Sequence, residues 1–368
     1  LRVGWDGGEW RQGALSGSVL ISGSAIKVDR AVIREPFLQL AGTAASDERV
    51  VLPEIDLPLD LQVEGLALEQ PGWDVYGSTG RLQSLRLGSG SWKHTELWLH
   101  ALQVDAGDPG SAVASGTLEF SGQWPLAVTL DAFPSARPEW PDMLERHIRV
   151  DASGELANLA LELTIGGTAS LSARGQLDSL DRLLPFSLTV DMDWPEQLLL
   201  AEQFAVPEQF SQVALRGPLV FAASGTLAEQ VFQLEMRPEV PGYEQFNLHV
   251  AGRHQRELLT VDDLHIEDAP GANTLWGAGE LRYGKQLQWS LALESSGLEL
   301  SPLNENLRGR LQGQLQLDGR VAGSDWELAL TDVSLDGEVN KLPARINGFA
   351  GLDSDLRLLP SQLAADLN

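Results

Sequence analysis

The sequence contains no cysteine, few basic residues and no long hydrophobic run, and each absence excludes a class of protein. Without cysteine among its 368 residues, the chain has no disulfides, thiolate nucleophiles or cysteine metal sites. Its 26 Lys and Arg face 52 Asp and Glu, which gives a net charge of -26. Nucleic acid is therefore a disfavoured partner, because affinity for it comes mainly from basic side chains that neutralise phosphates. Electrostatic docking on anionic lipid surfaces is disfavoured for the same reason.

No run of about 20 apolar residues and no apolar core of the signal-peptide type is present. The first residue is Leu1 rather than Met. We therefore expect this chain to be a fragment, with any membrane anchor or export signal of its parent outside it.

The stretch Ile55 to Leu68 shows what the sequence does contain. Its residues separate into two sets at a period of two. The apolar set is Ile55, Leu57, Leu59, Leu61 and Val63, and the other set is Asp56, Pro58, Asp60, Gln62 and Glu64. Because successive strand residues point to opposite faces, this pattern predicts a strand with one apolar and one polar face. At Gly65 the phase slips to Leu66 and Leu68, as expected where a glycine allows a bulge that restores the same face.

The same pattern recurs further along the chain. In Leu287 to Leu300 the alternation changes phase at Gly297, and in Leu259 to Ile266 it changes phase at Asp262 and Asp263. Residues 311–321 alternate leucine, glycine and valine with polar residues, mostly glutamine, without a slip. These copies indicate a repeated structural unit.

We predict an all-β fold in which residues 1–368 form one continuous β-repeat: an elongated, curled sheet with an apolar groove. One or two short helical interruptions are expected, within Pro138 to Val150 and within Trp194 to Phe210. The first has Met143, Leu144, His147 and Ile148 at spacings that suit a helical turn. We place possible boundaries between sub-repeats near 138–150 and 194–210.

Three patterns resemble chemical motifs. Residues Gly279 to Lys285 (GELRYGK) have the spacing of a phosphate-binding loop, but Gln286 replaces the Ser or Thr that binds magnesium. Because this segment joins two alternating stretches, we interpret it as a hairpin turn. The others are a histidine cluster and two carboxylate pairs, formed by His249, His254 and His265, by Asp191 with Asp193, and by Asp353 with Asp355. We interpret these as polar strand residues rather than metal ligands or catalytic groups, and we expect no cofactor and no enzymatic activity.

The 11 tryptophans are spread over the whole length, whereas a compact binding pocket would concentrate them. Core packing and cover of strand edges explain them, and lining of a long apolar surface is the alternative. A sheet with one apolar face must bury that face or offer it to an apolar partner. Acyl chains suit such a face, since they require no directed polar groups. The candidate groove residues are Leu57, Leu59, Leu61, Val63, Leu287, Trp289, Leu291, Leu293, Leu315 and Leu317.

The sequence also resembles a known family. LPEIDLPLDLQVEGLAL at residues 52–68, GRLQSLRLGSGSW at 80–92, and the ASGTL and ASGEL strands are similar to the TamB group of AsmA-like envelope proteins of Gram-negative bacteria. The resemblance implies a periplasmic protein anchored in the inner membrane, whose β-taco groove carries phospholipids toward the outer membrane. It also implies an Omp85-class, TamA-like outer-membrane barrel as partner, contacted through regions outside this fragment.

Two other functions fit the pattern. A periplasmic scaffold or chaperone would offer sheet edges to outer-membrane proteins by strand addition during their assembly or secretion. A β-helical enzyme acting on glycans would need a carboxylate cluster on one face, and the sequence shows none. Our leading hypothesis is the phospholipid conduit that supports outer-membrane biogenesis.

Overall fold

The chain is all-β in the computed structural model, as the alternating pattern predicted, and most strand pairs are antiparallel. The residues that the structure describes are 2–5, 8–11, 15–22, 25–40, 49–50, 52–75, 78–136, 143–195, 197–199, 214–239, 245–268, 273–284, 286–299, 308–322, 325–353 and 362–367. They contain no helix with the length and apolar character needed to span a membrane. The chain divides into two compact units, Leu1–Phe186 and Ser187–Asn368, which are described separately. The sub-repeat boundaries expected from the sequence remain predictions.

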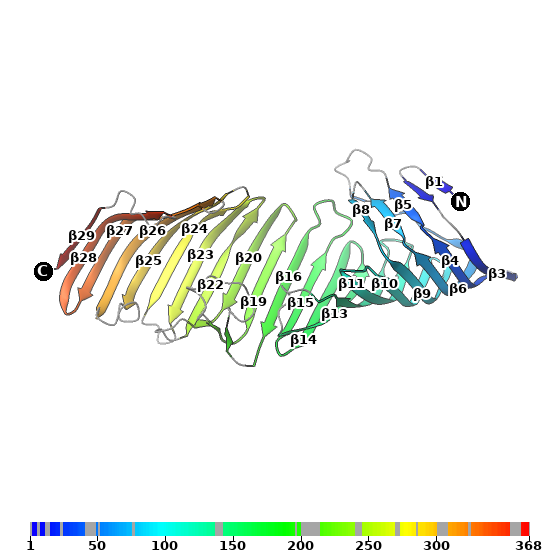
Figure 1. Ribbon diagram of the computed structural model, residues 1–368, viewed down its shortest axis with the longest axis horizontal. Helices are drawn as coiled ribbons and strands as arrows, with labels where there is room; N and C mark the ends of the chain where they lie inside the picture. The colour runs from blue at the N-terminus through cyan, green and yellow to red at the C-terminus, as the bar shows by residue number, and fades with distance from the viewer. Residues whose placement is uncertain are drawn as a thin grey trace. The chain divides into compact units, whose positions relative to one another are not determined.

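Unit 1 contains a main sheet in which neighbours in sequence are mostly neighbours in space (Figure 1). The strands of this unit are β1 (Arg2–Trp5), β2 (Gly8–Arg11), β3 (Leu15–Ser22), β4 (Ala25–Arg34), β5 (Phe37–Leu40), β6 (Leu57–Glu69), β7 (Gly72–Val75), β8 (Ser78–Arg81), β9 (Ser84–His94), β10 (Glu96–Asp105), β11 (Gly110–Glu119), β12 (Leu126–Pro134), β13 (Leu144–Glu155), β14 (Asn158–Gly167) and β15 (Ser170–Leu177). The main sheet pairs β3, β4, β6 and then β9 to β15 in that order.

At the N-terminal end of unit 1, long strands pass through a corner into a second sheet, β1-β2-β5-β7-β8. The residues at two of these corners are Glu35 and Gln70, which have φ of 50° and 52° and precede Pro36 and Pro71. Strands β4 and β6 are parallel, and so are β5 and β7. Both parallel pairs join residues 35 positions apart, as Ile33 with Leu68 and Phe37 with Gly72 show. The two corners therefore stack in register.

Unit 2 continues the up-and-down order (Figure 1). Its strands are β16 (Phe186–Asp193), β17 (Leu198–Leu199), β18 (Ala214–Leu215), β19 (Leu219–Gly225), β20 (Glu229–Met236), β21 (Pro238–Glu239), β22 (Phe246–Gln255), β23 (Leu258–Asp268), β24 (Thr274–Arg282), β25 (Leu287–Glu299), β26 (Gly309–Ala322), β27 (Asp325–Val339), β28 (Leu342–Asp353) and β29 (Gln362–Leu367). Strands β17, β18 and β21 form a small separate sheet, beside which Trp194 is buried and donates its indole N–H to the Leu215 carbonyl at 3.1 Å.

The phase slips predicted from the sequence are present. Gly65 has a φ of 79° and separates Val63 from Leu66, both partly buried. The register shifts by one residue beside Gly297, between Ser295 and Leu298. The register also shifts by one residue between β22 and β23, where residues 251/252 face 261–263. This shift corresponds to the phase change predicted at Asp262 and Asp263. The shifts at residues 251/252 and 295/298 mark β-bulges, which increase local twist and keep apolar residues on one face.

The helix predicted within Pro138 to Val150 is wrong where the structure describes it. Residues 144–150 belong to strand β13, whose register against β14 shifts between Leu144 and Ile148. This bulge inserts extra residues between apolar positions and so produces the spacing that looked helical. In the second predicted interruption, Leu198 and Leu199 form strand β17. Residues 196 and 200–210 of the second segment, and 138–142 of the first, lie outside the described residues.

Little of the apolar surface is buried deeply. Among the described side chains of large volume, only Pro36, at a corner, is less than 2% exposed. The accessible surface of the chain is 22535 Å², whereas a compact monomer of 39.9 kDa exposes about 14,000 Å². The sheets therefore carry apolar residues that no globular core covers.

Candidate functional site

In unit 1 the strand registers align apolar residues into ladders that run across the sheet. Directly paired residues of neighbouring strands point to the same face. One ladder from β6 to β15 consists of Leu66, Leu87, Leu102, Ala114, Leu130, Val150, Leu163 and Ala173. A second consists of Leu61, Trp92, Leu97, Leu118, Leu126, Gly154, Leu159 and Leu177. Side chains from every strand of this stretch thus combine into one apolar face.

Unit 2 has the same construction. One ladder from β19 to β26 consists of Phe221, Leu234, Val250, Leu264, Gly277, Leu293 and Leu315. The next, from β19 to β28, consists of Ala223, Phe232, Gly252, Val261, Gly279, Leu291, Leu317, Leu330 and Ala350. A third includes Leu259, Leu281, Trp289, Gly319, Leu328 and Leu352.

Most of the candidate residues named from the sequence fall on these faces. Those in the ladders above are Leu61, Trp289, Leu291, Leu293, Leu315 and Leu317. Val63 pairs with Gly90, and Leu287 pairs with Val321. Leu57 pairs with His94, and between Leu57 and Leu61 the register against β9 shifts. Leu59 lies inside this irregular stretch and is 38% exposed. The structure thus separates Leu57 and Leu59 from the regular part of the apolar face.

The ladder residues of the two faces are mostly partly buried. Leu66, Leu130 and Val150 in unit 1 and Leu291 and Leu317 in unit 2 share this intermediate exposure. They are covered by their neighbours along and across the strands, but not sealed beneath a second layer. These side chains therefore form a continuous apolar surface that keeps part of its exposure.

Large side chains on the unit 2 face lie over glycines of the next strand. A Cβ atom added to Gly319 would lie 2.1 Å from Cζ2 of Trp289, and one on Gly277 would lie 2.6 Å from Cδ2 of Leu293. The absence of a side chain at these glycines lets the large residues lie along the sheet. The face is smoother than its leucine and tryptophan content alone would produce.

The opposite face of unit 1 is polar. The ladder beside the leucines consists of Ala67, Arg86, Gln103, Val113, Asp131, Arg149, Thr164 and Ser172. Here Arg149 pairs with Asp151 at 3.0 Å, and Thr129 donates to Asp151 at 2.5 Å. The bond from Arg149, with that from Thr129, lowers the pKa of Asp151. This face is hydrated and charged, so the two faces of the sheet differ in chemistry.

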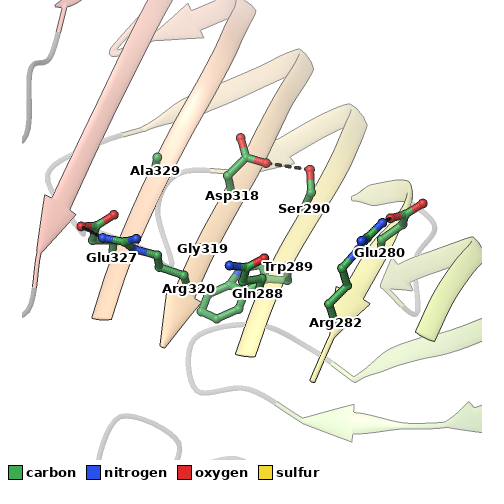
Figure 2. A pocket seen from close by; sticks show the side chains of 10 residues that line it. All are labelled: Glu280, Arg282, Gln288, Trp289, Ser290, Asp318, Gly319, Arg320, Glu327 and Ala329. Carbon is green, nitrogen blue, oxygen red and sulfur yellow. Dashed lines mark hydrogen bonds and ion pairs between the residues drawn. The ribbon is translucent and has the colours of Figure 1, made fainter. Parts of the chain in front are cut away.

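Strands β24 to β27 of unit 2 line a pocket of about 360 Å³, shown in Figure 2, to which Trp289 and Gly319 of the third ladder also contribute. Its charged side chains are paired: Arg320 with Glu327 at 2.6 Å and Arg282 with Glu280 at 3.3 Å. Asp318 lies between these pairs and accepts a hydrogen bond from Ser290 at 2.6 Å. Four of the five charged side chains of this pocket are therefore joined in ion pairs, and the fifth, Asp318, is held by hydrogen bonds.

Asp318 is held ionised by its neighbours. Partial burial acts to raise its pKa, but hydrogen bonds from Ser290, Thr331 and Gln316 outweigh burial and lower it. Thr331 donates at 2.9 Å and Gln316 at 3.3 Å. These hydrogen bonds join β25, β26 and β27 on the polar side, so this cluster stabilises the pairing of the three strands.

Two of the segments that resemble chemical motifs, residues 279–284 and the histidine cluster, lie in strands and a turn of the described structure. Residues 279–284 form the end of β24 and the turn toward β25, which confirms the hairpin. His249 and His265 pair directly across β22 and β23, whereas His254 is stacked on Tyr283, with centroids 5.8 Å apart. Within the described part of the chain, no three metal-binding side chains converge.

The carboxylate pairs and tryptophans are likewise dispersed. Asp191 and Asp193 lie two residues apart on β16, and Asp355 lies outside the described residues. Trp92 and Trp124 flank Phe120, with centroid distances of 4.6 and 4.8 Å. Trp98, in contrast, is 45% exposed. Some tryptophans thus pack against other aromatic rings, whereas others lie exposed on the surface.

Sequence reasoning missed much of the apolar face. The residues that it did not name as groove candidates include Leu66, Leu87, Leu102, Leu130, Val150, Leu163, Phe221, Leu234, Val250 and Leu264. Their alternation was visible within each strand. The partner of each strand, and hence the ladder, was not.

The chain is similar to a known family and to curated relatives. The family described as "TamB, N-terminal domain" matches residues 36–367. The "Translocation and assembly module subunit TamB" of Haemophilus influenzae is 21% identical over 318 residues, covering 83% of this chain. The chain spans only 23% of the length of this curated relative. No solved structure matches the chain.

Proposed function

The chain belongs to the TamB N-terminal domain family, and from this premise we propose that it is a non-enzymatic segment of an envelope translocation and assembly module that conducts phospholipid acyl chains. The observation that carries the proposal is the alignment of apolar residues into ladders across each unit, from Leu66 to Leu163 and from Phe221 to Leu315. The ladders run perpendicular to the strands, so a ligand can pass from strand to strand without meeting a charged group.

The chemistry of the face matches an acyl chain. Each methylene group moved from water onto an apolar surface contributes about 0.8 kcal/mol, and it requires no directed hydrogen bond. A charged side chain in the path would have to lose its hydration without a partner, which is unfavourable. An apolar face opposite a charged one therefore favours binding along the sheet while keeping the protein hydrated outside.

The setting of this segment follows from the same premise. We place it in the periplasm, in a parent anchored in the inner membrane by a segment outside this chain, with transport directed between the two membranes. The partner is an outer-membrane barrel of the Omp85 class, contacted through other regions of the parent. The name of the Haemophilus relative, a subunit of a translocation and assembly module, supports membership in such an assembly.

The name of the Haemophilus relative also supports a second function, a scaffold for the assembly or secretion of outer-membrane proteins. In that case an unfolded strand would add to a sheet edge through backbone hydrogen bonds. Proline substitutions in an edge strand would then impair function more than charges on the apolar face. The two functions thus require different surfaces of the same sheet.

Photo-crosslinking in the cell envelope separates them. We would place a photoreactive residue at Leu291, on the apolar face, and separately at Gln288, exposed on the polar face of the same strand. Phospholipid adducts at Leu291 and not at Gln288, identified by mass spectrometry, are the expected result. Adducts only with neighbouring residues of the chain at Leu291 would show a packed interior and overturn the conduit. Adducts with outer-membrane proteins would favour the scaffold.

A further inference from the structure

A chain segment that belongs to no strand lies along the loop edge of unit 1. It consists of Arg49, Val50 and residues 52–56, immediately before β6, and we call it the strap. Its backbone donates twice to loops at that edge. The Val50 N–H donates to the Leu180 carbonyl at 2.9 Å, and the Ile55 N–H donates to the Phe120 carbonyl at 3.0 Å.

Side chains reinforce this attachment at the middle and at one end of the strap. The Trp124 indole N–H donates to the Pro53 carbonyl at 3.0 Å. At the start of the strap, Arg49 pairs with Asp178 at 2.7 Å, across 129 positions of sequence.

The other end of the strap is also fastened. His94, at the end of β9, approaches Asp56 at 3.3 Å. The strap is therefore attached along its length to β9, to the loop after β11 and to the loop after β15.

The two loops that accept the backbone bonds are structural equivalents 60 residues apart. Trp124 and Leu184 have φ of 51° and 49°, and each precedes a proline. The Trp124 N–H donates to the Ser121 carbonyl, and the Leu184 N–H donates to the Asp181 carbonyl, both at 3.0 Å.

By the same offset, Phe120 corresponds to Leu180. Both side chains are buried, at 9% and 6% exposure, and both carbonyls accept a bond from the strap. The strap therefore connects the same point of two successive loops, which makes chance contact with the edge a poor explanation.

The length of the strap limits how far apart these points can be. Ile55 lies five positions after Val50, and an extended chain of that length reaches about 17 Å. From β11 to β15 the sheet has four strand spacings, which cover about 19 Å if the sheet is flat. A flat edge would thus place the two points slightly farther apart than the strap can reach, so the strap opposes flattening or spreading of the edge.

We propose that the strap is a tie that fixes the curvature of unit 1 at its loop edge by holding the loops after β11 and β15 at a set separation. The ladder of apolar residues nearest this edge ends at Leu159 and Leu177. The tie then also fixes the distance that this ladder covers between β11 and β15. This inference does not depend on the proposed function, since it concerns the sheet alone.

Distance measurements on the full-length protein test the tie. Because the described chain has no cysteine, a double Gln123→Cys and Leu183→Cys variant carries spin labels at two equivalent, exposed loop positions. Any cysteine elsewhere in the parent is replaced first. Pulsed electron paramagnetic resonance then gives the distribution of distances between the two loops. We expect one narrow distribution when the strap is intact.

A second set of variants removes single interactions between the strap and the loops. Val50→Pro removes the N–H that bonds Leu180, whereas Val50→Ala keeps it and serves as the matched control. Combining Val50→Pro with Arg49→Gln also removes the ion pair. We expect a longer mean distance and a broader distribution in the proline variants, and no change in the alanine control.

A second label pair reports whether the sheet is still folded. Arg86→Cys and Gln103→Cys occupy directly paired, exposed positions on β9 and β10, and their separation should stay constant in every variant. An unchanged loop distance in the combined variant would overturn the tie, because the sheet alone would then set the curvature. So would a distribution that is already broad with the native strap.

Discussion

The indole ring of Trp289 lies across Gly319 of the neighbouring strand, where an added Cβ atom would be 2.1 Å from Cζ2 of the ring. We predict that Gly319→Ala forces the ring off the sheet. The lost packing should lower the free energy of unfolding by about 1–2 kcal/mol, measurable by urea denaturation. Gly88→Ala is the matched control, because its nearest contacts would be at 3.5 and 3.6 Å. Equal effects of the two substitutions would contradict this packing relationship.

A charge on the apolar face should stop lipid passage without unfolding the protein. Leu291→Lys places an ammonium group in the ladder between Gly279 and Leu317, where it has no partner. We expect loss of function in cells that depend on this protein, measured by outer-membrane permeability at equal protein levels. Gln288→Lys, on the polar face of the same strand, should retain function. If both variants behave alike, the assignment of the conducting face is wrong.

Asp318 should make the protein less stable in acid. Its folded pKa is lowered relative to the unfolded value of about 3.9. Its contribution is therefore present above the unfolded pKa and is lost as pH falls through the folded pKa. Asp318→Asn should lower the urea midpoint at pH 7 and show a shallower decline between about pH 5 and pH 2. Parallel pH profiles for the two proteins would show that Asp318 is not a source of acid sensitivity.

A β-branched residue at the corner between β6 and β7 should destabilise the protein. Gln70 has a φ of 52°, a conformation that is strained for β-branched side chains. We predict that Gln70→Val lowers the free energy of unfolding by about 1–2 kcal/mol. The control is Gln62→Val, at an exposed strand position, which should change stability by less than about 0.5 kcal/mol. A small effect at Gln70 would show that the corner relaxes.

Local alternation predicted the strands and the two-faced character of the sheet. In Leu287 to Leu300, for example, the apolar set, the polar set and the bulge beside Gly297 were all visible in the sequence, and the structure has them in strand β25. Alternation failed at Leu144 and Ile148, where a bulge in β13 gave a helix-like spacing. The spacing of a few apolar residues does not distinguish a helical turn from a bulged strand, because both place residues three or four apart on one side.

The sequence by itself determined that the chain is all-β, that its strands have one apolar and one polar face, and that it resembles the TamB group. These properties follow from a period of two, which is local. Only the tertiary structure decided which strands are neighbours, including the parallel pairing of Ile33 with Leu68 and the ion pair of Arg49 with Asp178. Backbone hydrogen bonds are chemically the same for every strand, so pairing depends on the packing of side chains brought together from distant positions.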